Sequence, residues 1–129
     1  MANKISIVVV SGALERLQMA AMVVSVGAVS GDEVTVFLSM NALQHFRLGK
    51  GEPPEAEGSF GRSLQQKKGP GYRQLFQSAA ELGDARIYPC SMAVDVLGVA
   101  PNELEPWVLE PLGLTRFLSD AHGSQVWTF

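Results

Sequence analysis

Apolar residues follow two patterns that alternate along the chain. Short runs rich in β-branched residues are typical of strands buried on both faces, and apolar residues three or four positions apart are typical of helices. The predicted strands span residues 5–10, 33–38, 86–88 and 125–129, and the predicted helices span 13–28, 72–82, 92–97 and 112–121. A short helix is expected after Asn41, ending near Leu48, and a short helix or turn at 102–108. The alternation predicts an α/β fold, with a mostly parallel sheet and helices on both faces.

The predicted helix 13–28 is apolar on nearly all of its sides. Leu14, Leu17 and Val24 share one stripe, and Met22 and Val26 extend the apolar surface around the cylinder. A helix that is apolar all round is usually buried all round. A small sheet covers only one side of it. We therefore expect a second subunit to cover another side, which makes the protein a homo-oligomer.

The segment 49–71 differs in character from the rest of the chain. It holds Pro53, Pro54 and Pro70 among many Gly, Glu, Gln and Lys residues, and it has little apolar content. Loops of this length are usually functional lids or disordered. We therefore predict one domain, residues 1–129, in which residues 50–71 form a mobile lid or docking loop; 129 residues are enough for a single core.

Composition and charge exclude several classes of partner. The net charge is −3 and the only adjacent basic pair is Lys67-Lys68, so no nucleic acid is expected to bind. The longest nearly uncharged apolar stretch, Leu17 to Val29, is shorter than the roughly 20 residues that span a bilayer, so no transmembrane segment is expected. The N-terminal apolar run reads as a strand rather than a signal peptide. A single cysteine cannot form an internal disulfide, which is in keeping with a reducing cytoplasm.

That cysteine, Cys90, lies between the predicted strand 86–88 and the helix that begins near Met92. A strand that leads into a helix leaves the junction residue at the carboxyl edge of the sheet, where ligands bind in open α/β folds. Free N–H groups at a helix start favour an anion, and a thiolate is one. We therefore predict that Cys90 is partly exposed and reactive. The alternative is that it is a small buried apolar residue, the usual role of a lone cysteine.

Spacing excludes several other thiol chemistries. A CxxC redox site requires a cysteine where the chain has Ala93, and phosphatase-like or rhodanese-like loops require an arginine where it has Val96 or Asp95. One cysteine and two scattered histidines do not make a zinc site, so no metal is expected. No GxGxxG or complete P-loop motif is present, and no cofactor is expected. His45 is interpreted as a surface helix residue rather than a base.

Other strand ends should meet Cys90 at this edge of the sheet. The residues predicted to line a binding pocket there are Ser11, Gly12, Ser39, Met40, Asn41, Ser91 and Met92, the Ser91 contribution being its N–H group. Serine and asparagine are also common helix caps, and methionine commonly fills a core. Capping and core filling therefore remain as alternatives to a pocket for these residues.

Three segments resemble the DsrE/DsrF-like family, in its branch sometimes labelled peroxiredoxin-like. CSMAVDVLGVAPNEL, from Cys90 to Leu104, is similar to the branch pattern of a cysteine followed by apolar-Asp-apolar-apolar-Gly and an acidic-Leu turn. GDEVTVFLSMNAL resembles its second strand with the turn that follows, and EPLGLTRFLSDAHGSQVWTF resembles its last helix and closing strand. The resemblance covers most of the chain outside residues 50–71.

The resemblance implies a Rossmann-like or flavodoxin-like subunit that assembles into trimers or hexamers. It also implies that Cys90 carries sulfur as a persulfide between donor and acceptor proteins. Two departures affect this implication. The chain has Asn41-Ala42 where the family often has an aromatic residue and glycine, and it lacks the further cysteines of many relatives. An intramolecular sulfur shuttle is therefore impossible.

Three functions remain after these considerations. The favoured one is a cytoplasmic sulfur-relay protein in which Cys90 takes up a sulfane sulfur and yields it to a partner thiol. The alternative is a non-catalytic module that binds a small ligand or a partner at the same edge, with Cys90 merely packed. A thiol peroxidase is the third, and it would require a resolving thiol from another molecule.

Overall fold

The computed structural model describes residues 3–49, 52–67 and 69–129. Its elements alternate between strands and helices along almost the whole chain. In order they are β1 (Lys4–Val9), α1 (Leu14–Val29), β2 (Glu33–Leu38), α2 (Met40–Leu43), the 3-10 turn η1 (Gln44–Phe46), α3 (Ser59–Gln66), α4 (Tyr72–Gly83), β3 (Arg86–Pro89), α5 (Ser91–Leu97), the 3-10 turn η2 (Pro101–Glu103), α6 (Leu114–Asp120) and β4 (Gln125–Thr128).

The four strands form one sheet in the order β3-β2-β1-β4, and every neighbouring pair is parallel. Strand β1 lies inside the sheet, paired with β2 from Lys4↔Glu33 onward and with β4 from Ile5↔Gln125 onward. Its β-branched residues are accordingly buried or half-buried, as expected for a central strand. The predicted α/β fold with a parallel sheet is confirmed.

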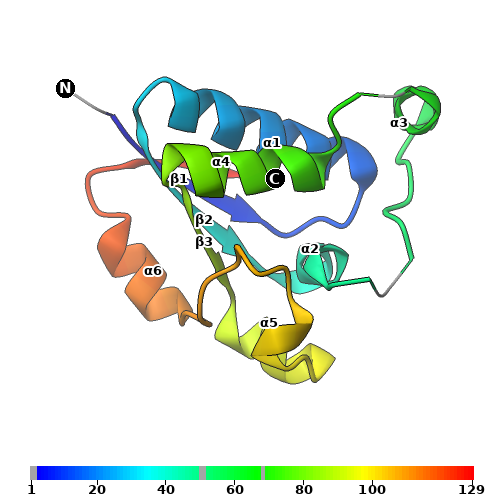
Figure 1. Ribbon diagram of the computed structural model, residues 1–129. Coiled ribbons are helices and arrows are strands. Elements are labelled where there is room, and N and C mark those ends of the chain that lie inside the picture. The colour runs from blue at the N-terminus through cyan, green and yellow to red at the C-terminus, as the bar shows by residue number, and fades with distance from the viewer. Residues whose placement is uncertain (1–2, 50–51, 68) are drawn as a thin grey trace.

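Helices cover the sheet on both faces (Figure 1). Helices α1 and α4 lie together on one face, above residues such as Ile7, Val36 and Ile87, which are fully buried. Helix α6 lies on the other face, where the ring of Phe117 stacks on Phe37 with 4.8 Å between ring centroids. Phe117 is the one buried residue of this helix, whereas Leu114 and Leu118 are more than half exposed.

The two outer strands of the sheet, β3 and β4, differ in what lies beside them. Beyond β3, the segment 109–112 runs alongside the strand: the N–H of Leu109 donates to the carbonyl of Ile87 at 2.8 Å, and that of Leu112 to Pro89 at 2.9 Å. Strand β4 has β1 on one side, and all four of its residues are exposed. Segment 109–112 therefore extends the sheet at the edge nearest Cys90.

The segment predicted to be a mobile loop contains a helix, α3, that the sequence did not indicate. Of its eight residues only Gly61 is buried, and Phe60 is 74% exposed. Such a helix has no apolar stripe pointing at the core, and that stripe is the usual signal in a sequence. Residues 50, 51 and 68 of the predicted loop lie outside the described residues. In Figure 1, α3 stands apart from the sheet and its main helices.

No helix in the described part of the chain is both long enough and apolar enough to cross a bilayer.

Candidate functional site

Cys90 occupies the junction between β3 and α5, as predicted. Its N–H donates to the carbonyl oxygen of Leu38 at 2.8 Å, and it forms an isolated parallel bridge with Leu112. The residue is therefore still paired on both sides, at the end of the sheet rather than beyond it. Its side chain is only 5% exposed, so the prediction of a partly exposed cysteine is wrong for the single chain.

The start of α5 offers fewer free donors than expected. The N–H of Ser91, predicted to line the site, donates to the carbonyl oxygen of Leu112 at 3.0 Å. The carbonyl of Cys90 accepts from Val94 at 2.9 Å, which begins the helix. In the described structure the N–H groups of Met92 and Ala93 have no acceptor. These two groups, rather than Ser91, are the ones able to stabilise negative charge next to Cys90.

The junction between β2 and α2 carries backbone strain. Met40 has a φ of 50°, in the left-handed region that a non-glycine residue rarely adopts, and its side chain is 56% exposed. Ser39 before it is buried, donates its N–H to Val9 at 2.9 Å and makes no side-chain cap. Strain of this kind concentrates at functional sites. The left-handed backbone turns the chain away from the end of β2 at Met40, at the same edge of the sheet as Cys90.

A mostly apolar cavity of about 330 Å³ lies between α2 and α5. Its lining consists of Met40, Asn41, Met92, Ala93, Val96 and Leu97. Three of the predicted site residues, Met40, Asn41 and Met92, therefore do come together. Cys90 does not line this cavity. The nearest α5 residue that does, Met92, is two positions further along the chain.

A second cavity, of about 540 Å³, lies on the other side of α2. Ser11, Gly12 and Asn41 line it, so Asn41 borders both cavities. The hydroxyl of Ser11 accepts the N–H of Ala13 at 3.1 Å, so this serine stabilises the turn that precedes α1 and does not cap the helix. Five of the seven predicted pocket residues are thus divided between two neighbouring cavities, whereas Ser39 and Ser91 line neither, and the seven do not gather around Cys90.

His45, expected to be a surface helix residue, also lines the 540 Å³ cavity. A Cβ atom at position 12 would lie 2.9 Å from its Nε2 atom, so Gly12 leaves the room that the imidazole occupies. The hydroxyl of Tyr72 donates to the His45 carbonyl oxygen at 2.8 Å, which fixes the turn. No local sequence signal marks this histidine, because Gly12 and Tyr72 are distant in the chain.

The environment of His45 keeps its imidazole neutral. Burial lowers the pKa of His45 below the usual 6.5, the positive charge of Arg73 lowers it further, and a contact with the backbone of Glu52 partly opposes the shift. Its Nδ1 atom is buried without a hydrogen-bond partner among the described residues. Arg73 is held in place by Glu105, whose carboxylate lies 2.6 Å from it. A neutral imidazole can either accept or donate a proton in this cavity.

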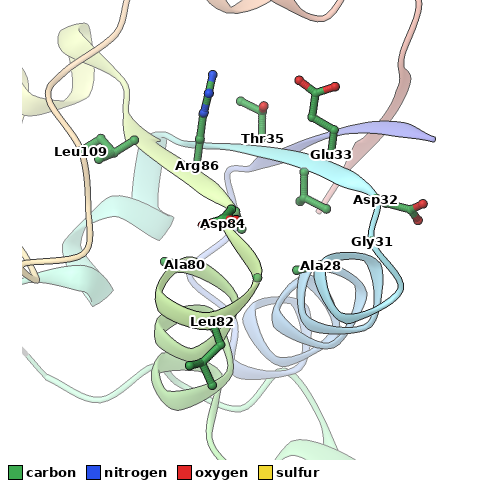
Figure 2. A pocket seen from close by; sticks show the side chains of 13 residues that line it. Ala28, Gly31, Asp32, Glu33, Thr35, Ala80, Leu82, Asp84, Arg86 and Leu109 are labelled. Carbon is green, nitrogen blue, oxygen red and sulfur yellow. The ribbon is translucent and has the colours of Figure 1, made fainter. Parts of the chain in front are cut away.

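A larger cavity, of about 780 Å³, lies at the opposite, amino edge of the sheet and contains none of the predicted residues. Figure 2 shows Arg86, Thr35 and Glu33 pointing away from the helices, while Leu82 points the other way and Asp32 to the side. These side chains diverge and do not surround a common point. The volume of this cavity is therefore not sufficient evidence that it is the functional site. Among the described residues, no group of three or more potential ligands could hold a metal ion.

Comparisons with solved structures identify the fold. The crystal structure of the YchN protein from E. coli matches with a TM-score of 0.72 at 15% identity and covers 100% of both chains. The structure of MTH1491 from Methanobacterium thermoautotrophicum, a protein of unknown function, matches with a TM-score of 0.66 at 12% identity, covering 98% of this chain and 99% of that one. At these identities the two structures show the shared fold alone.

Sequence comparison identifies the family. No curated protein matches the chain. The model of the DsrE/DsrF/DrsH-like family matches residues 55–129, which is more than half of the chain and includes β3, Cys90 and α5. The resemblance stated from the Cys90 segment is therefore confirmed, and the chain belongs to the DsrE/DsrF/DrsH-like family.

Proposed function

We propose that the protein carries sulfane sulfur as a persulfide on Cys90 and transfers it to the thiol of a partner protein. The observation that carries this proposal is the position of the only cysteine, at the strand-to-helix junction of a chain that belongs to this family. The carboxyl edge of a parallel sheet is the usual place for ligands and reactive groups.

The chemistry is two thiol exchanges. In the first, the Cys90 thiolate attacks the outer sulfur of a donor persulfide; a new S–S bond forms on Cys90, the donor S–S bond breaks, and the donor leaves as a thiolate. In the second, an acceptor thiolate attacks the outer sulfur on Cys90, which leaves as a thiolate again. No net oxidant or reductant is consumed. Because no second cysteine is available within the chain, the persulfide persists until an acceptor arrives.

The surroundings of Cys90 support this chemistry in two ways. The unpartnered N–H groups of Met92 and Ala93 favour an anionic sulfur at the start of α5. The half-exposed side chains of Met40 and Met92 are flexible and line the adjacent cavity. Since Cys90 itself is buried, we expect rotation of these methionines to open the path for the donor sulfur.

Location, partners and assembly belong to the same proposal. A sulfur relay of this kind takes place in the cytoplasm, between a donor and an acceptor protein. The subunit acts as a homo-oligomer, a trimer or hexamer as the family resemblance implies. The outward side of α1 supports assembly, because Met19, Met22, Val26 and Val29 are between 46% and 84% exposed in the single chain.

The decisive experiment offers the protein glutathione persulfide and measures its intact mass before and after reductant. The wild type should gain one sulfur atom and lose it on reduction, and Cys90→Ser should gain none. A double variant, Cys90→Ser with Ser91→Cys, moves the thiol by one half-buried position and serves as the matched control. It should load poorly. If the wild-type protein takes up no sulfur while its thiol can still be alkylated, the relay function is excluded.

The alternative is a module that binds a small ligand without chemistry at Cys90. The burial of Cys90 and the 540 Å³ cavity beside His45 favour it. A protein that never loads sulfur but is stabilised against heat by a small molecule, with that effect lost in His45→Ala, would support this function instead.

A further inference from the structure

Residues 52–58, here called the strap, run across the beginning of α1. The N–H of Leu14 donates to the carbonyl oxygen of Glu55 at 2.9 Å. In the other direction, the carboxylate of Glu15 accepts the N–H of Glu57 at 2.7 Å and that of Gly58 at 2.7 Å. The strap and the first turn of α1 thus satisfy each other's backbone groups.

Glu15 is the centre of this arrangement. Hydrogen bonding from the Glu57 N–H is the main reason that the pKa of Glu15 lies below its usual 4.5; partial burial opposes the shift, and the N–H groups of Glu15 itself, Gly58 and Gly61 add to it. The carboxylate also fills the space next to Gly61, where a Cβ atom would lie only 2.4 Å from the carboxyl carbon. It therefore joins α1 to the strap and to α3 at once.

Few other contacts hold α3 against the rest of the molecule. Gly61 is its one buried residue, and a cavity of about 500 Å³ separates it from α1, bounded by Leu14 and Gln18 on one side and Leu64 on the other. The side chain of Gln18 donates to the Pro70 carbonyl oxygen at 3.2 Å at the far end of the segment. Elements with little buried apolar surface open at low free-energy cost. The Glu15 hydrogen bonds therefore attach the start of α3 to α1, while the Leu14–Glu55 backbone bond and the buried Pro54 attach the strap before it.

The strap also forms one wall of the 540 Å³ cavity at the carboxyl edge. Its residues in that wall are Glu52, Pro53, Glu55, Ala56 and Glu57. They face Gly12, Asn41 and His45 across the cavity. Displacing the strap would remove this wall and expose the imidazole of His45.

We propose that the strap is a gate over this cavity and that Glu15 is the latch that holds it shut. Loss of the Glu15 acceptor releases the strap and α3 together and opens the cavity from the α3 side. The gate covers the cavity beside His45 and not Cys90, so this proposal does not depend on sulfur transfer at Cys90.

Several charged groups lie on α1, the strap, α3 and η1. They are Arg16 on α1, Glu52, Glu55 and Glu57 on the strap, Arg62 on α3 and His45 on η1. Arg16 pairs with Glu57 at 3.3 Å, but both side chains are about half exposed, so this pair holds the strap weakly. A carboxylate with a lowered pKa keeps its hydrogen bonds above about pH 4.5 and loses them as pH falls through its folded value. The gate is therefore closed at neutral pH and opens in acid.

The test measures how fast diethylpyrocarbonate modifies His45 at neutral pH, with the exposed His122 of the same molecule as an internal reference. In Glu15→Gln the ratio of the His45 rate to the His122 rate should rise severalfold, because an amide is a weaker acceptor for the Glu57 and Gly58 N–H groups. Glu33→Gln, which changes an exposed glutamate on β2, should leave the ratio unchanged. An unchanged ratio in a folded Glu15→Gln protein overturns the proposal.

A pair of glycine variants tests the same gate without altering Glu15. Gly61→Ala places a methyl group against the Glu15 carboxylate and should also raise the His45 ratio, whereas Gly58→Ala meets that carboxylate at an ordinary 4.0 Å and should not. This pair decides the matter if Glu15→Gln fails to fold. Amide exchange at Glu57 and Gly58 should accelerate in every variant that opens the gate. Faster exchange with an unchanged His45 ratio would show that the strap moves but does not gate the cavity, which also overturns the proposal.

Discussion

The N–H of Cys90 and the carbonyl oxygen of Leu38 are joined by a hydrogen bond of 2.8 Å. This bond ties the cysteine to the end of β2, and the bridge to Leu112 ties it on the opposite side. The thiol position is thus set by the backbone ladder of the sheet and not by a flexible loop. Functional groups on such rigid elements are positioned more accurately than those on loops.

Met40→Gly should make the protein more stable. The left-handed backbone at Met40 costs a non-glycine residue about 1 to 3 kcal/mol, and glycine adopts it without strain. Because the Met40 side chain is more than half exposed, little burial is lost. We expect a net gain of about 1 kcal/mol in the free energy of unfolding, measured with urea.

Met92→Gly is the matched control, since it removes a similarly exposed methionine at the same edge from an ordinary helical position. It should cost about 1 kcal/mol, the usual penalty for glycine in a helix. If both variants lose stability alike, the backbone at Met40 is not strained.

Arg73→Gln should raise the pKa of His45. The Arg73 charge is the second of the two causes that lower this pKa, and burial, the larger cause, would remain. The pKa should therefore move toward 6.5 without reaching it. NMR titration of the imidazole Cε1 proton would measure the change.

The lowered pKa of His45 also makes the stability of the folded protein depend on pH. The folded protein disfavours protonated His45, so the unfolded chain binds the proton first and stability falls as pH drops below 6.5. Arg73→Gln should make this fall shallower. Arg86→Gln, at the opposite edge of the sheet, should change neither the titration nor the slope.

Phe46→Ala should destabilise the protein by about 3 to 5 kcal/mol. The Phe46 ring is fully buried and makes edge contacts with Tyr72, Phe76 and Trp107 at centroid distances of 5.7, 5.2 and 5.9 Å. Denaturant unfolding would measure the loss. Phe60→Ala, on the exposed surface of α3, should stay within about 0.5 kcal/mol of the wild type.

Val26→Glu should dissociate the proposed homo-oligomer. Val26 is 67% exposed in the middle of the outward apolar side of α1, where a buried charge would be costly. Light scattering at micromolar concentration should show an assembly for the wild type and a mass near 13.9 kDa for the variant. Phe60→Glu should leave the assembly intact. A wild type that is already monomeric would rule the assembly out.

The strands were predictable because each is a short run that contains β-branched or aromatic residues, and such a run can be recognised without knowledge of distant residues. The run 5–10 indicated a buried central strand, and β1 is one. The lone cysteine and its junction were likewise visible in the sequence, because strand and helix patterns meet there. These features are local, and local pattern is what a single sequence records.

Features that depend on distant partners were not predictable. The pairing that keeps Cys90 within the sheet involves Leu112, which is 22 positions further along the chain, and the place of His45 depends on Gly12 and Tyr72. Helix α3 has two large apolar residues, Phe60 and Leu64, and Phe60 is exposed, so its apolar pattern was too short to predict a helix packed on the core. It is attached to α1 through Glu15. The division of the predicted pocket into two cavities arises from α2, which lies between them.

The parallel pairing of β1 with β4 has a consequence for synthesis on the ribosome. Ile5 is registered with Gln125, so the second edge of an interior strand can be paired only after nearly the whole chain has been made. Until then β1 presents unpaired N–H and C=O groups along a β-branched run, the kind of edge that invites pairing between nascent chains. Closure by β4 is therefore a late, long-range step, and the growing polypeptide depends on α1 and β2 to shield its first strand in the meantime.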